Sequence, residues 1–181
     1  LASLFAASPH PVTTDSSLVG RGVSHELAIE RSHSLSDVRY DLVLDVTARD
    51  SAPGRVLIAF RRGGTKDVIL DFRGRRLGTV TVNDVRVDKT VFNGAHLRLP
   101  ASSLRVGDNS VTVDFVANIA PAGASIIRFT DRSDDSDYLY TLLVPADANQ
   151  LFPCFDQPDL KARVRLTLRA RLAWTAIANG A

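Results

Sequence analysis

The imidazole and thiol side chains typical of zinc sites are few in this 181-residue sequence, four histidines and one cysteine, and an aspartate-rich run is a third candidate for binding a metal. A zinc site needs three or four converging ligands. The histidines are His10, His25, His33 and His96, and no two of them have His-x-x-x-His spacing. The single cysteine, Cys154, can form neither an intrachain disulfide nor a cysteine-based zinc site. The sequence therefore predicts no metal site within this chain.

The aspartate-rich run, residues 131–137, begins like a calcium-binding loop. Such a loop needs Gly at its sixth position and Glu at its twelfth, where this sequence has Ser136 and Leu142. An acidic turn between two strands is the better interpretation, because aspartate and serine are typical turn residues.

Cys154 is a poor candidate for a nucleophile. Its neighbours are a proline and a phenylalanine, and an apolar setting raises the pKa of a thiol. The sequence has no Gly-x-Ser-x-Gly elbow and no phosphate-binding glycine loop. We therefore predict no catalytic residue in this chain; the residues alone indicate a domain that binds, spaces or supports another part.

The composition is that of an ordinary folded domain, with 45% hydrophobic and 23% charged residues and a net charge of +2. Basic and acidic residues are interspersed, and the longest basic runs are Arg61–Arg62 and Arg75–Arg76. A nucleic-acid-binding protein concentrates basic residues on one face, so we expect no nucleic-acid partner. No segment reaches the roughly 18 apolar residues of a transmembrane helix, so we expect no membrane span.

The N-terminal part divides into two segments. Residues 1–22 are predicted to be a flexible leader or the remnant of a secretory signal, because residues 1–7 are apolar and the rest are rich in Ser, Thr, Pro and Gly. Residues 23–36 predict a short helix and a linker, with Ser24 as the N-cap; an extended lead-in strand is the alternative. This pattern leaves open whether the protein is cytoplasmic, periplasmic or secreted.

From residue 37 onward the hydrophobic pattern has a period of two. In residues 37–47, alternate positions from Tyr40 to Val46 are apolar and, apart from Val43, the positions between them are polar. Turn residues separate further predicted strands at 56–61, 68–72, 79–82, 96–99, 110–117, 126–130, 138–143, 164–170 and 174–178. Residues 37–181 thus predict an all-β domain, a β-sandwich or stacked mixed and antiparallel sheets, preceded by one short N-terminal helix.

Two segments near the C-terminal end carry a family resemblance. Tyr138-Leu-Tyr-Thr141 is followed, at matching spacing, by Phe152-Pro-Cys-Phe-Asp-Gln-Pro-Asp-Leu-Lys-Ala162. This pattern resembles the N-terminal domain of the aminopeptidase N family of zinc metallopeptidases, the gluzincin aminopeptidases, whose domain is β-rich and saddle-like. A looser resemblance extends from Leu35 to Ala181.

We expect residues 152–158 to form a packed structural corner. Pro153 and Pro158 each fix φ near about −65° and disfavour helix in the preceding residue. Phe152 and Phe155 supply apolar anchors, and Asp156 is expected to accept backbone N–H bonds in the turn that follows it. The residues of this corner are Phe152, Pro153, Cys154, Phe155, Asp156, Gln157 and Pro158.

The resemblance implies a non-catalytic N-terminal domain of a zinc-dependent aminopeptidase, which removes N-terminal residues from peptides and of which this domain shapes one side of the cleft. It places the family's zinc ligands, His-Glu-x-x-His and a distant Glu, in a catalytic domain after this one. We therefore expect no cofactor in this chain and zinc in that domain. The expected partners are the catalytic domain and the peptide substrates of the parent enzyme.

One departure concerns the loop after Thr141. In many family members this loop carries Gln-x-Glu or Gln-x-Gln, which reaches the cleft and helps to bind the substrate's α-amino group. The matching positions here are Leu142 and Val144, followed by Pro145, and a valine cannot pair with an ammonium ion. We favour an altered, apolar pocket; compensation by the catalytic domain and a degenerate parent enzyme are the alternatives. The surface of residues 142–155 is expected to be apolar, because it packs on the catalytic domain.

Two other functions fit the sequence less well. A stand-alone β-sandwich binding module explains the missing catalytic residues but not the string from Phe152 to Ala162. A scaffolding homologue would have a downstream domain that has lost its zinc ligands. The following stretch of the reading frame distinguishes them, because only the enzyme requires His-Glu-x-x-His.

Overall fold

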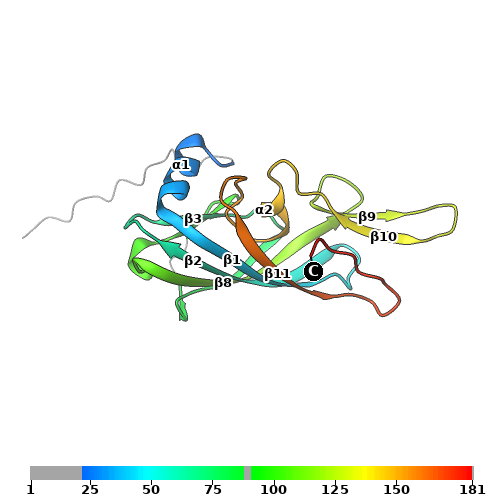
Figure 1. Cartoon of the computed structure of the whole chain (residues 1–181). Coiled ribbons are helices and arrows are strands. Elements are labelled where there is room, and N and C mark those ends of the chain that lie inside the picture. The colour runs from blue at the N-terminus through cyan, green and yellow to red at the C-terminus, as the bar shows by residue number, and fades with distance from the viewer. Residues whose placement is uncertain (1–21, 88–90, 181) are drawn as a thin grey trace, which may run out of the picture.

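Strands dominate the part of the chain that the structure describes, which is residues 22–87 and 91–180 of a computed structural model (Figure 1). The helices are α1 (His25–Ser34), the 3-10 helix η2 (Ala101–Ser103) and α2 (Ala148–Leu151). The strands are β1 (Leu35–Asp45), β2 (Ser51–Arg62), β3 (Val68–Asp71), β4 (Arg76–Val82), β5 (Val85–Arg86), β6 (Val91–Phe92), β7 (His96–Leu99), β8 (Gly107–Ala120), β9 (Ile126–Thr130), β10 (Asp137–Thr141) and β11 (Ala162–Arg169). The prediction of a β-rich domain with a short N-terminal helix is confirmed.

The strands form two sheets. The larger has the order β10-β9-β8-β2-β1-β11, with β4 paired to β8 and β5 to β4; the smaller has the order β3-β7-β6. The β1–β11 and β8–β9 pairs are parallel and the others are antiparallel, which confirms the expected mixed sheets. Both sheets contribute to a single hydrophobic core, in which Phe72, directly after β3, meets Phe115 of β8 at a ring-centroid distance of 5.8 Å.

The period-two pattern of β1 determines which face is buried. Tyr40, Leu42, Leu44 and Val46 are each at most 5% exposed, whereas Val43 on the opposite face is 49% exposed. Because the side chains of a strand alternate between the two faces of its sheet, this spacing places every second residue in the core. β1 pairs with β2 along most of its length and with β11 on its other side, so it lies within the larger sheet next to the edge strand β11.

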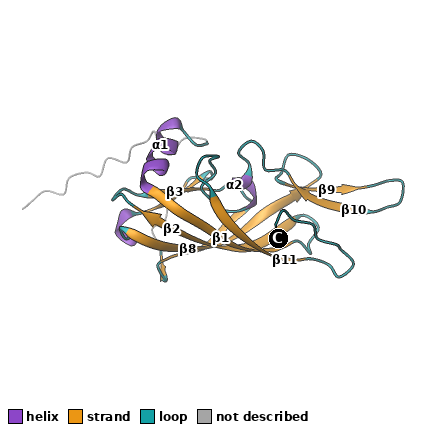
Figure 2. Cartoon of the chain, viewed as in Figure 1, coloured by secondary structure: helices purple, strands orange, loops and turns teal. Residues whose placement is uncertain are grey.

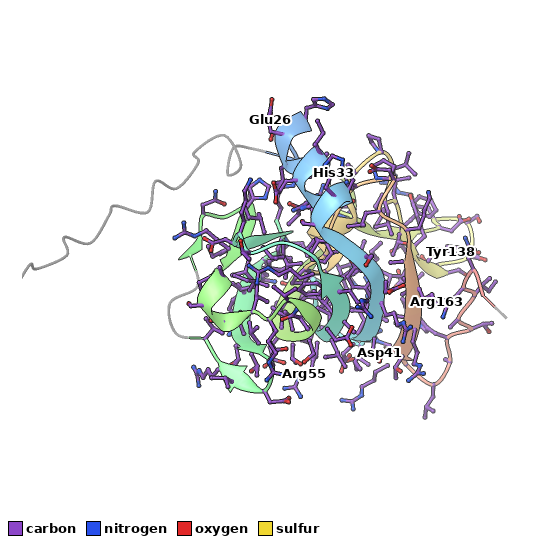
Figure 3. The ribbon with its side chains drawn as sticks, turned by 60° about the vertical axis from the view of Figure 1, so that its left-hand side comes forward. Glu26, His33, Asp41, Arg55, Tyr138 and Arg163 are labelled. Carbon is purple, nitrogen blue, oxygen red and sulfur yellow. The ribbon has the colours of Figure 1, made fainter. Side chains whose placement is uncertain are left out.

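Helix α1 resolves the choice between helix and strand for the N-terminal segment. The Ser24 hydroxyl accepts a hydrogen bond from the Leu27 N–H at 3.1 Å, as expected of an N-cap. Leu27 and Arg31, one turn apart, are buried, while Glu26 and His33 point to solvent (Figure 3). Apart from Gly22, the predicted leader (residues 1–22) lies outside the described residues.

The prediction of a strand at residues 174–178 is wrong, because these residues form a loop (Figure 2). Among the described residues β11 pairs only with β1, so its outer edge has no strand partner, yet residues 174–178 form no ladder with it. The short β5, β6 and α2 were not predicted, since β5 and β6 have only two residues each and α2 is a single turn of helix.

Gly54 allows β2 to lie close to Phe115 of β8 and to the main chain of β1. It lies directly opposite Phe115 on β8, and a Cβ atom added to it would lie 2.5 Å from the Phe115 ring and 2.8 Å from the Val43 carbonyl oxygen. We predict that Gly54→Ala lowers the free energy of unfolding by about 1–3 kcal/mol through overpacking. In the control Gly63→Ala, the added Cβ meets only the Ser34 carbonyl oxygen at 3.8 Å. Equal urea-unfolding midpoints for the two variants would contradict this account.

Candidate functional site

The corner predicted from residues 152–158 is held against the end of β3. Cys154 and Asp71 form an isolated antiparallel bridge, in which the Asp71 N–H donates to the Cys154 carbonyl at 2.8 Å and the Cys154 N–H donates back at 3.1 Å. Two segments more than 80 residues apart in the sequence are therefore joined by main-chain hydrogen bonds.

The two phenylalanines of the corner pack in the core, as predicted. Phe152 meets the ring of Tyr40 edge-on at 5.4 Å, and Phe155 meets Phe60 edge-on at 5.5 Å. The Tyr40 hydroxyl accepts a hydrogen bond from the Phe155 N–H at 2.9 Å. Burial raises the pKa of the Cys154 thiol well above its usual range.

The Asp71 carboxylate, whose residue is 2% exposed, is the centre of a buried polar cluster. Arg31 of α1 donates to both of its oxygens at 2.8 Å, in a bidentate pair. The Nδ1 atom of His96 on β7 lies 2.9 Å from one carboxylate oxygen, and the Asp156 N–H donates to the other at 2.9 Å. One carboxylate thus connects α1, β3, β7 and the corner.

Arg31 and His96, two partners of this carboxylate, have further contacts. The Arg31 guanidinium also donates to the Ile69 carbonyl at 2.8 Å and lies 5.6 Å from the centre of the Phe155 ring. The Nε2 atom of His96 lies 3.1 Å from the Gly22 carbonyl oxygen. Both ring nitrogens of His96 therefore face oxygen atoms.

Burial and hydrogen bonding have opposite effects on the Asp71 carboxyl. Burial raises its pKa, but the hydrogen bond from His96 and the guanidinium of Arg31 outweigh burial, so the pKa lies below its ordinary value. The carboxylate is therefore charged in the folded protein at neutral pH.

Asp156 and Gln157 fasten the corner to its neighbours. The Asp156 carboxylate accepts from the backbone N–H of Asn149 at 3.0 Å and from its side-chain amide. The expectation that Asp156 accepts backbone N–H bonds was right, but its partner precedes it in α2 instead of following it in the turn. The Gln157 side-chain amide donates to the Ala28 carbonyl of α1 at 3.1 Å.

The predicted cleft loop lies on the surface, between the β9–β10 hairpin and α2. Leu142 is 54% and Val144 75% exposed, and Pro145 is exposed as well. Together with Tyr138 and Tyr140 on the same hairpin, they form an exposed apolar surface, of which Tyr138 is labelled in Figure 3. The expected apolar surface over residues 142–155 therefore exists only at its first end, because the aromatic residues of the corner are buried within the domain.

Comparison with known proteins supports the predicted resemblance. The family model for the peptidase M1 N-terminal domain matches residues 36–181. The aminopeptidase N of Streptomyces lividans is 32% identical over 166 residues, which cover 88% of this chain and 19% of that protein. The chain belongs to the peptidase M1 N-terminal domain family.

Solved structures show the same fold. Native yeast LTA4 hydrolase matches with a TM-score of 0.66 at 17% identity, over 77% of this chain and 23% of that one. An M1 zinc metallopeptidase from Deinococcus radiodurans matches with a TM-score of 0.64 at 19% identity, over 82% of this chain and 35% of that one. This M1 N-terminal domain thus spans about a fifth to a third of the length of these relatives.

Sequence reasoning missed the partners that hold the signature of this M1 N-terminal domain. Arg31 lies 40 residues before Asp71 and His96 lies 25 residues after it, and the three residues show no shared motif. The one available signal is Asp71, a charged residue that ends the apolar run Val68–Leu70, because a charge in a fully buried strand requires a partner.

The described part of this M1 N-terminal domain offers no metal site. Across residues 22–87 and 91–180, no group of three or more His, Cys, Asp or Glu side chains is placed to hold a metal ion. In the same ranges, no helix is long and apolar enough to cross a membrane.

We predict that Asp71→Asn lowers the free energy of unfolding by about 3–5 kcal/mol near pH 7, because it leaves the buried Arg31 without its counter-charge. Asp41→Asn is the matched control, since Asp41 and Arg165 form an exposed pair at 3.5 Å, and it should cost about 1 kcal/mol or less. Because the folded pKa of Asp71 is depressed, its contribution is full above about pH 4 and is lost as pH falls through that pKa. Urea unfolding between pH 3 and pH 7 measures both effects; a difference from wild type that does not shrink in acid would contradict this account.

Proposed function

We propose that this chain is the non-catalytic N-terminal domain of a zinc-dependent aminopeptidase and that it forms one side of the active-site cleft. The observation that carries the proposal is the division of the 138–158 segment. Its second half is fixed in the core by the Asp71 cluster, while its first half exposes Tyr138, Tyr140, Leu142 and Val144. An exposed apolar surface on a rigid base is typical of a docking or substrate-facing surface.

A second exposed surface supports a large intramolecular partner. Val164, Leu166 and Leu168 of β11 are 60%, 46% and 39% exposed, although they lie in register with Tyr40, Leu42 and Leu44 of β1, which are buried. The core face of the larger sheet therefore continues uncovered onto β11. We propose that the catalytic part of the parent protein packs on the domain.

The similar protein from Deinococcus radiodurans is an M1 zinc metallopeptidase. We place the zinc of the parent protein in its catalytic part. The donor set of the described residues does not fit a zinc site, since His96 is already held by a carboxylate and a carbonyl and Cys154 is buried with a raised thiol pKa. No catalytic step is therefore assigned to residues of this chain. Its role is to orient the loop and to exclude water from one side of the cleft.

The loop at Leu142–Pro145 suggests an altered recognition of the substrate's amino end. Neither Leu142 nor Val144 offers an acceptor for an ammonium group. If this loop faces the substrate, the amino group binds to groups of the catalytic part, and the pocket on this side favours an apolar first residue.

Full-length parent protein tests the enzyme hypothesis. We predict that it contains about one zinc ion per chain and hydrolyses aminoacyl reporters, whereas the 181-residue chain alone binds no stoichiometric zinc and hydrolyses none. Metal analysis and a fluorogenic aminoacyl substrate measure both. A parent protein without zinc and without activity would favour the scaffolding homologue, and activity of the isolated chain would overturn the domain assignment.

Val144→Glu in the parent protein tests whether the loop faces the substrate. We predict that the introduced carboxylate pairs with the substrate ammonium and lowers KM for aminoacyl substrates about tenfold, as a charge-assisted hydrogen bond would. Val85→Glu on β5 is the matched control, because Val85 is 67% exposed and lies outside this surface. Equal KM values for both variants and wild type would show that position 144 does not face the substrate.

A further inference from the structure

Arg128 is a buried charge in the most extended part of the domain. It lies on β9, one strand of the β9–β10 hairpin at the opposite end of the molecule from α1 (Figure 1), and it is only 7% exposed. A buried guanidinium is costly unless its donors are satisfied, so its contacts indicate what it does.

The guanidinium of Arg128 contacts the other strand of its hairpin and two segments that are distant in the sequence. Its Nη2 and Nε atoms donate to the carbonyls of Ala48 and Arg49 at 3.1 and 3.2 Å. Its Nη1 atom donates to the Asp137 carboxylate on β10 at 3.0 Å. Its Cζ atom lies 5.3 Å from the ring centre of Trp174, in the segment that follows β11.

The acceptor loop between β1 and β2 is itself well fixed. Its carbonyls at positions 47 to 50 each accept a hydrogen bond, two of them from Arg128. Thr47 accepts from the Arg171 side chain at 3.2 Å, and Asp50 accepts from the Ile119 N–H on β8 at 3.0 Å. Arg128 therefore attaches the hairpin to a loop that the rest of the domain already holds in place.

The hairpin has little other attachment to the larger sheet. β9 pairs with β8 through only two positions, Ile126 and Ile127, and the other apolar attachments near Arg128 are Ile126 in the core and Leu139, opposite Arg128, packed against the core. Its two faces differ, because Arg128 points toward the acceptor loop while Phe129 and Tyr138 on the other face are 54% and 52% exposed. The direction of the hairpin depends on what holds the Arg128 face.

We propose that Arg128 is a positioning residue that fixes the direction of the β9–β10 hairpin and, through it, of the Leu142–Pro145 loop. The loop follows β10 directly, and the Leu142 N–H donates to the Ser125 carbonyl at the start of β9 at 2.9 Å, so hairpin and loop move together. The consequence for substrate binding rests on the proposed function, in which this loop faces the cleft.

The first test uses the 181-residue chain and its single tryptophan, Trp174, as the reporter. In Arg128→Met, amide protons of residues 126–141 should exchange at least about tenfold faster while those of β1 and β2 do not change, and Trp174 fluorescence should shift. Arg128→Lys, which keeps the charge but loses the planar fork, should lie between Arg128→Met and wild type. Arg132→Met, at the exposed turn of the same hairpin, is the control and should leave both readouts unchanged. Unchanged hairpin exchange in Arg128→Met, or a uniform rise across β1 and β2, would overturn the proposal.

The second test uses the parent protein and separates this proposal from the proposed function. Arg128→Lys should raise KM for aminoacyl substrates about fivefold or more with kcat within about twofold, because the loop is displaced while the catalytic part is intact. A loss of kcat with unchanged KM would indicate a general structural defect and overturn the positioning role. If the hairpin loosens in the first test but KM does not change, Arg128 positions the hairpin and the cleft-facing role of the loop is wrong.

Discussion

The fold depends on a carboxylate that is almost fully removed from water. Asp71 is retained in the core because Arg31, His96 and the Asp156 N–H together satisfy both of its oxygens. Burial alone would make this charge very costly, so the cluster is stable only when all its members are present. The cluster therefore joins α1, β3, β7 and the corner into one unit. The Phe152–Pro158 corner is thus part of an electrostatic arrangement whose other members lie far away in the sequence.

The same physical principle recurs at the other end of the molecule with different partners. Arg31 is satisfied mainly by a carboxylate in the core, whereas Arg128 is satisfied by main-chain carbonyls, the partly exposed Asp137 and an indole ring. The first arrangement fixes the segment after the loop and the second fixes the hairpin before it. Between these two fixed points Leu142, Val144 and Pro145 are exposed, whereas Leu143 is partly buried against the core. A loop held at both ends is ordered without being buried, which is what a surface that presents side chains to a partner requires.

Strand positions followed from the sequence wherever one face of a strand is buried and the other is wet. β1 and β9 were predicted to within two residues, because alternation in a half-buried strand is a local property. The ends of β2 and β8 were underestimated: Ser51–Arg55 of β2 pair with Asp114–Asn118 of β8, and Ile119 and Ala120 of β8 pair with β9, so these ends follow from pairing and not from their own pattern. Residues 174–178 have the pattern of a strand but form no ladder, although the outer edge of β11 has no strand partner among the described residues, so the pattern alone does not make a strand.

The sequence by itself determined the β class and the family, and it predicted Ser24 as a helix N-cap and a packed corner at Phe152–Pro158. Each of these depends on residues close together in the chain or on a contiguous string. Only the tertiary structure decided that Asp71, Arg31 and His96 are the partners of that corner, that Asn149 is the partner of Asp156, and that Arg128 holds the hairpin. These contacts join residues whose separation in the chain carries no pattern. Their energy appears only when water is excluded from all partners at once, which is a property of the packed core and not of any segment.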